Sequence, residues 1–259
     1  LVVVGESPYN SVYLNNVVEV RSGANHNVAL IKEQNENHTQ YDVPEDKAFT
    51  SKNGYVFAWG DNSEGQFGKT TANSNSYAPV RVDIPDDEVI NHISAEKNSN
   101  LATTADNTVW AWGNYADGQM GANGTSSAPV QIVSNDGGVW SSSNGIKGAL
   151  NGAAGGDSMS AYISDGTVWT WGNTYDGSTS SMVNRTSPVR VVKNVGKDST
   201  TYLENIKHIA AGPTHMLAVD TDGQVWALGN NANGKLGIGG TSTACLLYTS
   251  PSPRDRTRS

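Results

Sequence analysis

One short motif recurs four times in this chain and constrains its fold more than any other feature. The clearest copy reads S-D-G-T-V-W-T-W-G-N at residues 164–173. It joins a turn-forming pair to an alternating apolar run. Asn-Gly and Asp-Gly pairs favour a tight hairpin turn because both residues tolerate positive φ. The motif therefore predicts a β hairpin in each copy. The other copies are Tyr55–Gly60, Thr108–Gly113 and Gln224–Gly229.

The motif strand has apolar groups on both of its faces. Side chains alternate across a strand, so Trp169 and Trp171 share one face, while Val168 and Thr170 share the other. A strand of this kind is expected to be covered on both sides. This favours a stacked or radial array of sheets.

The repeat extends beyond the hairpin in both directions. An alanine lies upstream in every copy, three residues after His26, Ser99, Ser158 and His215, and six residues after Gly23, Glu96, Gly155 and Gly212. A G-x-x-G box follows the motif at 65–68, 118–121 and 234–237, and the third copy keeps only Gly177. One shared position holds Trp59, Trp112, Trp171 and Leu228, at spacings of 53, 59 and 57 residues. Such a period, with several short strands, predicts a propeller or a solenoid.

The combined pattern resembles the regulator of chromosome condensation repeat. It reads G-x-x-H-x-x-A-L, then D-G-x-V-W-x-W-G-x-N-x-x-G-Q-x-G, then P-x-x-V, and covers roughly residues 16–243. The resemblance implies an all-β fold, a seven-bladed β-propeller with four-stranded antiparallel blades, of which this chain holds about four. It also implies that the repeated tryptophans fill the space between blades and that the glycine after each W or L permits a tight turn. The expected structural signature is Trp59, Gly60, Trp110, Trp112, Gly113, Trp169, Trp171, Gly172, Trp226 and Gly229, with Gly23, Gly155, Gly212, His26 and His215.

The spacing divides the chain into blades. The expected boundaries are 1–15 for the end of a preceding blade, 16–88, 89–145 and 146–204 for three blades, and 205–244 for a partial blade. The first blade carries a polar insertion at about 32–52, interpreted as a solvated loop, with a partner-binding loop as the alternative. Trp140 lies outside the motif, where core filling is favoured over surface stacking. Because four repeats do not complete a seven-bladed ring, we expect a fragment.

The tail at 245–259 differs in kind from the repeats. It reads C-L-L-Y-T-S-P-S-P-R-D-R-T-R-S and matches no repeat position. One codon choice for Cys245–Ser250 resembles the transposon end used in sequencing library preparation. We therefore expect a non-native tail, translated from adapter, and exclude it from fold reasoning. It holds the only cysteine, so the repeats have no disulfide, cysteine-ligated zinc or thiol nucleophile.

No catalytic, cofactor or metal pattern stands out. Serine replaces His26 and His215 in the other two repeats, which favours a shared turn hydrogen bond over a metal or base pair. The polar residues after each W-G, such as Asp61 and Glu64, lack the alternating ligands of a calcium loop and favour Asx turns. P-loop and nucleophile-elbow signatures are absent from the sequence. We expect no enzyme activity, no cofactor and no metal.

Charge and composition narrow the expected partners. The formal net charge of −8 disfavours binding to nucleic acid, and no apolar run approaches the ~20 residues of a membrane span. An acidic composition rich in Asn, Ser and Thr suits a bacterial protein that is exported or on the cell surface. The leading prediction is a non-catalytic module that binds a protein or a glycan. The alternatives are a guanine nucleotide exchange factor for a small GTPase, by family analogy, and an inhibitor of a secreted enzyme.

Overall fold

The computed structural model describes residues 3–4, 12–14, 16–32, 54–69, 75–106, 108–121, 128–132, 149–155, 158–163, 166–177, 181–193, 201–238 and 248–249. Nearly all of the predicted insertion at 32–52 lies outside the described residues, as does Trp140.

The described residues form four antiparallel sheets of four strands each, here called blades 1 to 4, and one two-stranded ladder. Blade 1 is β3 (Val17–Ser22), β4 (His26–Ile31), β5 (Tyr55–Gly60) and β6 (Ser76–Arg81). Blade 2 is β7 (Ile90–Glu96), β8 (Ser99–Thr104), β9 (Val109–Gly113) and β10 (Val130–Gln131). Blade 3 is β11 (Ala149–Ala154), β12 (Ser158–Ile163), β13 (Val168–Thr174) and β14 (Val183–Arg190). Blade 4 is β15 (Ile206–Gly212), β16 (His215–Asp220), β17 (Val225–Gly229) and β18 (Tyr248–Thr249), with the short helix η2 (Ala232–Gly234) after β17. The ladder pairs β1 (Val3–Val4) with β2 (Val12–Tyr13).

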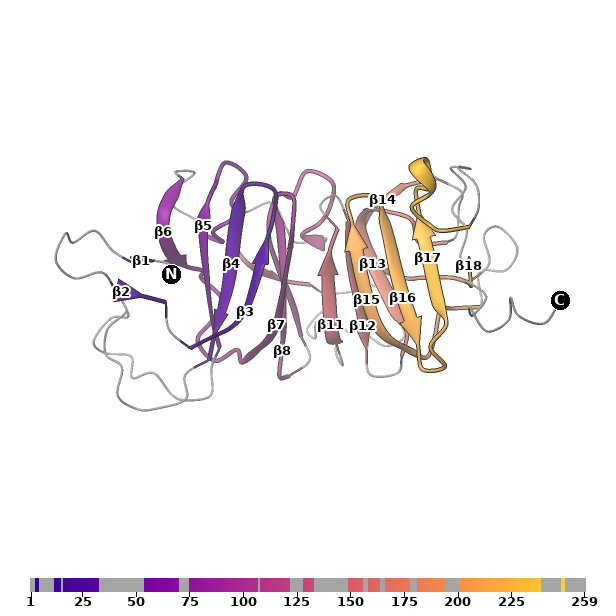
Figure 1. Cartoon of the computed structure of the whole chain (residues 1–259), viewed down its shortest axis with the longest axis horizontal. Coiled ribbons are helices and arrows are strands. Elements are labelled where there is room, and N and C mark those ends of the chain that lie inside the picture. The colour runs from indigo at the N-terminus through magenta and orange to yellow at the C-terminus, as the bar shows by residue number, and fades with distance from the viewer. Residues whose placement is uncertain are drawn as a thin grey trace.

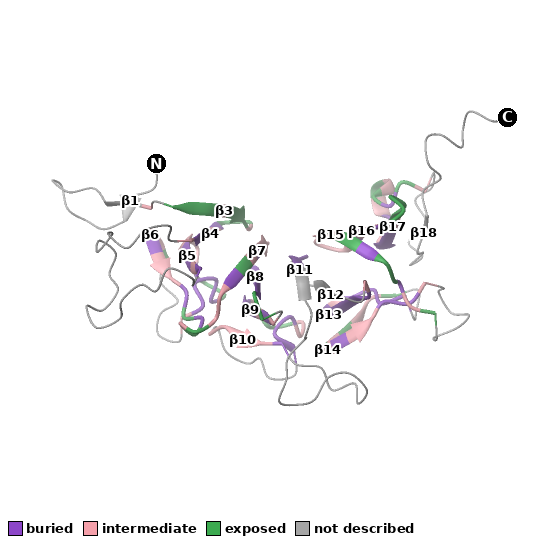
Figure 2. Ribbon diagram, turned by 90° about the horizontal axis from the view of Figure 1, so that it is seen from below, coloured by how far each residue is buried: buried purple, intermediate pink, exposed green. Residues whose placement is uncertain are grey.

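The blades stand side by side along an arc. Within each blade the strands pair in chain order, as a meander of hairpins. Figure 1 shows the four sheets in sequence from one end of the molecule to the other. Figure 2 shows β3, β7, β11 and β15 on the inner side of the arc. The prediction of an all-β fold that forms part of a propeller is confirmed.

The repeated alanine has a structural reason. In every blade it lies directly opposite the aromatic residue that follows the motif valine. The pairs are Ala29 with Phe57, Ala102 with Trp110, Ala161 with Trp169, and Ala218 with Trp226. Directly opposed residues have their Cβ atoms about 5 Å apart, so a small residue leaves room for a large ring.

Each inner strand also carries the same irregularity. The register with the next strand shifts between Val17 and Glu19 in blade 1, and at the equivalent place in the other three blades. A β-bulge increases the local twist and bends a strand. Because the bulge recurs at the equivalent position, all four inner strands are expected to bend at the same place.

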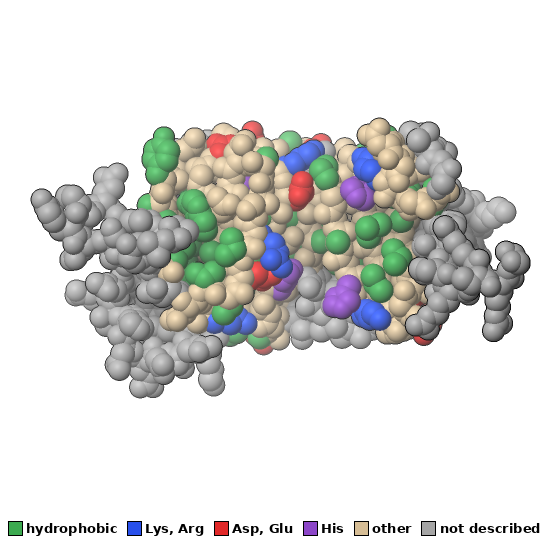
Figure 3. Space-filling view, viewed as in Figure 1, with side chains coloured by type: hydrophobic (Ala, Val, Ile, Leu, Met, Phe, Trp, Pro, Cys, Tyr) green, Lys and Arg blue, Asp and Glu red, His purple; other side chains and the backbone are tan. Residues whose placement is uncertain are grey.

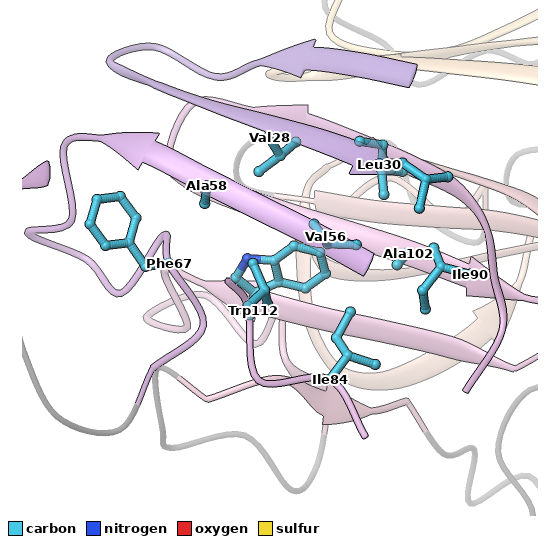
Figure 4. Close-up of a cluster of buried hydrophobic side chains, with 11 residues drawn as sticks. Val28, Leu30, Val56, Ala58, Phe67, Ile84, Ile90, Ala102 and Trp112 are labelled. Carbon is cyan, nitrogen blue, oxygen red and sulfur yellow. The ribbon is translucent and has the colours of Figure 1, made fainter. Parts of the chain in front are cut away.

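The hydrophobic core lies between blades rather than inside one sheet. Each of three buried clusters combines side chains of two neighbouring blades. Between blades 1 and 2, Trp112 lies in one buried cluster with Val56, Phe67 and Ile84 (Figure 4). Since a lone blade cannot bury such a face, neighbouring blades stabilise one another.

The outer strand of blade 4 departs from the sequence prediction. The partial blade was expected to end at residue 244, yet Tyr248 and Thr249 of the tail pair with Ala227 and Trp226. Pairing along a strand edge uses backbone groups, so it does not depend on the repeat signature. The adapter origin of the tail stays a prediction, because strand pairing does not test it.

The glycine that ends each motif strand sits against a neighbouring turn. Gly60, Gly113 and Gly229 have φ of +106°, +106° and +124°. A Cβ on Gly113 would lie 2.2 Å from the backbone oxygen of Asn98, and one on Gly60 would lie 2.5 Å from that of Asn25. Backbone conformation and space therefore both require glycine there.

We expect Gly113→Ala to destabilise the chain by roughly 2–5 kcal/mol, from the left-handed backbone and the clash together. Gly223→Ala is the matched control, since Gly223 has φ of +82° but nothing within 4 Å of a Cβ. The control should lose only about 1–2 kcal/mol. Urea unfolding measures both, and equal losses would contradict the role given to the Asn98 contact.

Candidate functional site

Two tryptophans each form a hydrogen bond to the preceding blade. The indole Nε1 of Trp112 on β9 donates to the backbone oxygen of Gln66 at 3.0 Å. The Nε1 of Trp171 on β13 donates to the backbone oxygen of Gln119 at 2.8 Å. Gln66 and Gln119 hold the same position in the G-x-x-G boxes of blades 1 and 2. We call this contact the indole tie.

The glutamine of the box shapes the loop that presents the carbonyl. The Oε1 of Gln66 accepts a hydrogen bond from the N–H of Glu64 at 2.9 Å, and the Oε1 of Gln119 accepts one from Asp117 at 2.9 Å. Both glutamines are fully buried. Because buried polar groups need hydrogen-bond partners, the glutamine side chain bonds within its own turn, while the glutamine backbone carbonyl accepts from the indole.

Asn100 adds a second connection at the same seam, the name used here for the packed interface between two neighbouring blades. Its Nδ2 donates to the Gln66 carbonyl at 3.2 Å, and its Oδ1 lies 2.8 Å from Nε2 of His26. Since Oδ1 can only accept, the proton of His26 sits on Nε2, and Nδ1 has no hydrogen-bond partner. The predicted turn hydrogen bond is therefore wrong for His26. Its ring points across the seam, and its bond links blade 1 to blade 2.

The histidines require the glycines that precede them. A Cβ on Gly23 would lie 2.2 Å from Cε1 of His26, and one on Gly212 would lie 2.5 Å from Cε1 of His215. Blade 2 has Glu96 and Ser99 at these positions. Blade 3 has Gly155 with Ser158, so the sequence alone does not couple the two positions, and only the structure shows the ring lying on the glycine.

Burial disfavours the charged form of both histidines. It lowers the pKa of His26, against the hydrogen bond to Asn100, which raises it. Burial and then the charge of Lys235 lower the pKa of His215. In both cases the native state binds fewer protons than the unfolded chain near the ordinary value of 6.5.

The loops after W-G form the predicted Asx turns in three blades. The side-chain oxygens of Asp61, Asn114 and Asn230 accept from the N–H two residues later, at 3.1, 2.8 and 2.6 Å. In blade 3, Asp176 is buried and accepts from Nε of Arg185 at 2.8 Å. These side chains stabilise turns and one ion pair.

The inner face carries a charged cluster and an apolar surface. Glu19 on β3 accepts from the N–H of Ile93 at 2.9 Å, lies 2.7 Å from Nδ1 of His92, and pairs with Arg21. Burial would raise the pKa of Glu19, but the hydrogen bonds from His92 and Ile93 outweigh it and lower the pKa. On the same strand, Val17, Val18 and Val20 are 37%, 53% and 50% exposed. We call these three residues the valine surface. Hydrophobic side chains gather around β3 and β4 in Figure 3.

One arginine stacks on a motif tryptophan. The guanidinium carbon of Arg190 lies 5.1 Å from the ring centre of Trp169 and 5.2 Å from that of Tyr202. The Arg190 guanidinium thus forms a cation–π contact with each of these two rings.

The other signature residues take the following places. Trp59 is the next-to-last residue of β5 and is half-buried, as are Trp110 and Trp226. Gly172 lies within β13 with φ of +82°, and Gly155 is buried after β11. Among the described residues, no three His, Cys, Asp or Glu side chains gather as metal ligands. The same residues contain no helix that is long and apolar enough to cross a membrane.

Comparison with known families matches two segments of the chain. Residues 53–100 and 206–235 each match a description of the regulator of chromosome condensation (RCC1) repeat. They cover the motif of blade 1 and most of blade 4. The chain therefore contains RCC1 repeats.

Curated relatives of this RCC1 repeat protein are longer. The human probable E3 ubiquitin-protein ligase HERC6 is 29% identical over 73% of this chain but only 18% of its own length. The ultraviolet-B receptor UVR8 of Arabidopsis thaliana is 29% identical over 60% of this chain and 32% of its own. This chain therefore spans less than a third of either relative.

Solved structures match the fold of the repeat protein. Human WBSCR16 superposes with a TM-score of 0.71 at 20% identity, covering 94% of this chain and 55% of that one. Prp20p of Saccharomyces cerevisiae, described with its binding properties to Gsp1p and histones, gives 0.64 at 18% identity, covering 97% and 53%. The arc of four blades thus corresponds to about half of each of these chains.

We expect Trp112→Phe to lower the free energy of unfolding by about 1–3 kcal/mol, because it removes the indole tie and leaves a small cavity. Trp226→Phe is the control, since Trp226 is partly exposed and donates within its own blade to Asp220 at 2.9 Å. Urea unfolding should give a clearly smaller loss for the control. An equal loss of unfolding free energy would show that the hydrogen bond to Gln66 adds no more stability than a bond within one blade.

Stability should fall with acid in two separate steps. The depressed pKa of His26 and of His215 contributes stability that is present above 6.5 and is lost as the pH drops through the lower folded values. The depressed pKa of Glu19 acts only below its ordinary value of 4.5. We expect His26→Ser, which copies Ser99 of blade 2, to flatten the pH dependence of the urea midpoint between about pH 5 and 7.

The control for the pH experiment is His208→Ser, because His208 is exposed on β15. It should leave the slope between pH 5 and 7 as it is in the parent protein. A slope that changes equally in both variants would contradict the assignment to buried His26.

Proposed function

We propose that this RCC1 repeat protein is a non-catalytic module that binds a protein partner, with the valine surface on β3 at the centre of the contact. The observation that carries the proposal is three exposed valines on one inner strand of the propeller arc. Exposed apolar side chains that gather in one place commonly mark an interaction surface.

The surroundings of the valine surface suit a protein ligand. Glu19 and Arg21 on the same strand pair with each other, so charge at the edge is already balanced. An apolar centre with a polar rim is typical of protein interfaces. The proposed partner therefore contributes aliphatic or aromatic side chains rather than a highly charged surface.

The alternative is a guanine nucleotide exchange factor, supported by the likeness to Prp20p, whose binding to Gsp1p is described. That likeness concerns the fold, and exchange activity would be a property of the whole protein. The predictions of bacterial origin, export and a glycan ligand rest on composition alone and stay predictions.

The test is selection of a phage-displayed peptide library on the immobilised full chain. We expect enriched peptides whose binding is reduced at least about tenfold by the double variant Val18→Asp and Val20→Asp, since hot-spot losses of this size are usual. Tyr77→Asp is the control, because Tyr77 is 101% exposed on β6, outside the valine surface. The control should bind like the parent, and circular dichroism should show that all variants are folded.

Peptides that bind the parent and the valine variant equally well would contradict the proposed surface, and no enrichment would contradict a protein ligand. A glycan array probed with the same chain would then support the glycan prediction if specific sugars bind. Accelerated nucleotide release from Gsp1p would favour the exchange factor instead.

A further inference from the structure

The seam between blades 3 and 4 lacks the contact that holds the other two seams. Trp112 and Trp171 each donate an N–H to a carbonyl of the preceding blade. Blade 4 has Leu228 at this position, and a leucine side chain has no donor. Leu228 is nevertheless buried, so it contributes packing without the directional bond.

A tyrosine of blade 3 supplies the bulk that Leu228 lacks. Tyr175 is 9% exposed and packs in the same cluster as Leu228, Val191 and Met216. Its sequence equivalents in blades 1 and 2 are Ser63 and Ala116, which are small and exposed. At this seam the large side chain therefore lies on a loop of the preceding blade, whereas at the other two seams it lies on a strand of the following blade.

The packing at this seam is incomplete. A small open cavity is lined by Tyr175, Met182, His215 and Leu228, among others. Atoms that face a void lose dispersion contacts, and unbranched methionine side chains adapt readily to changes in shape. In this part of the seam, the side chains of Leu228 and Met216 contribute apolar contacts only.

A different part of the same seam is held through the main chain. The N–H of Ile206 at the start of β15 donates to the carbonyl of Gly166 at 2.9 Å. A Cβ on Gly166 would lie 2.8 Å from the backbone nitrogen of Asn205, so the two chains approach closely here. This contact lies before β13 begins, whereas Tyr175 follows the end of β13. The seam is therefore fastened at one end of the strand and loosely packed at the other.

We infer that the seam between blades 3 and 4 is a hinge. Blades 1 to 3 move as one body, and blade 4 swings about the contact of Gly166 with Ile206. The swing opens the seam between Tyr175 and Leu228. Packed interfaces switch between discrete arrangements rather than deform continuously, so the open seam is a second state.

Distances between spin labels test the hinge in the full chain. Cysteines replace exposed residues in a Cys245→Ser background, and the pairs are Ser63 with Ala116, Ala116 with Asn184, and Asn184 with Lys235. They report on seams 1–2, 2–3 and 3–4. Double electron–electron resonance should show one distance at the first two seams and a second, longer population at the third. A single narrow distance at the third seam, or a longer population at all three, would overturn the hinge.

Two variants test its cause. Tyr175→Ala with Leu228→Trp copies the small and large residues of blades 2 and 3, and should remove the longer population at the third seam. Trp171→Leu removes an indole tie and should create a longer population at the second seam. If the double variant does not fold, Trp171→Leu decides, because an unchanged second seam would overturn the role of the tie.

Discussion

The indole tie is the contact on which the arrangement of the blades depends. A sheet of this chain exposes an apolar face that only another sheet can cover, and hydrophobic contact between two such faces does not specify their relative angle. A hydrogen bond has both length and direction. The hydrogen bonds of Trp112 and Trp171 to carbonyls of the preceding blade therefore fix the relative orientation of two blades that are otherwise in hydrophobic contact.

Several other repeat features serve this tie or the sheet that carries it. The box glutamine closes the loop that presents the carbonyl, and the glycine after the motif allows the chain to turn against a neighbouring backbone oxygen. The repeated alanine leaves room for the aromatic residue opposite. Local turn chemistry, strand pairing and interblade packing thus all agree, which is characteristic of sequences that specify one fold.

The departures from the repeat are informative for the same reason. Blade 4 loses the motif tryptophan where blade 3 loses most of its box, so both halves of one tie are absent at a single seam. The volume is recovered by Tyr175, whereas the directional bond from strand to loop is not available to Leu228. A propeller with one seam of a different kind combines a rigid body with a movable blade. The valine surface lies at the other end of the arc, on the rigid part.

The sequence by itself determined the class of fold, because hairpin turns, alternation and a fixed period are local properties of neighbouring residues. It identified the positions of Trp112, Trp171 and the motif glycines, and the Asx turns of blades 1, 2 and 4. It did not reveal that Gln66 meets Trp112 or that Asn100 meets His26, since these pairs are 46 and 74 residues apart and only blade packing brings them together. It also assigned His26 to a turn and set aside the tail that supplies β18. Those contacts depend on which groups the tertiary structure leaves facing one another at a seam or an open strand edge, and no local pattern encodes that.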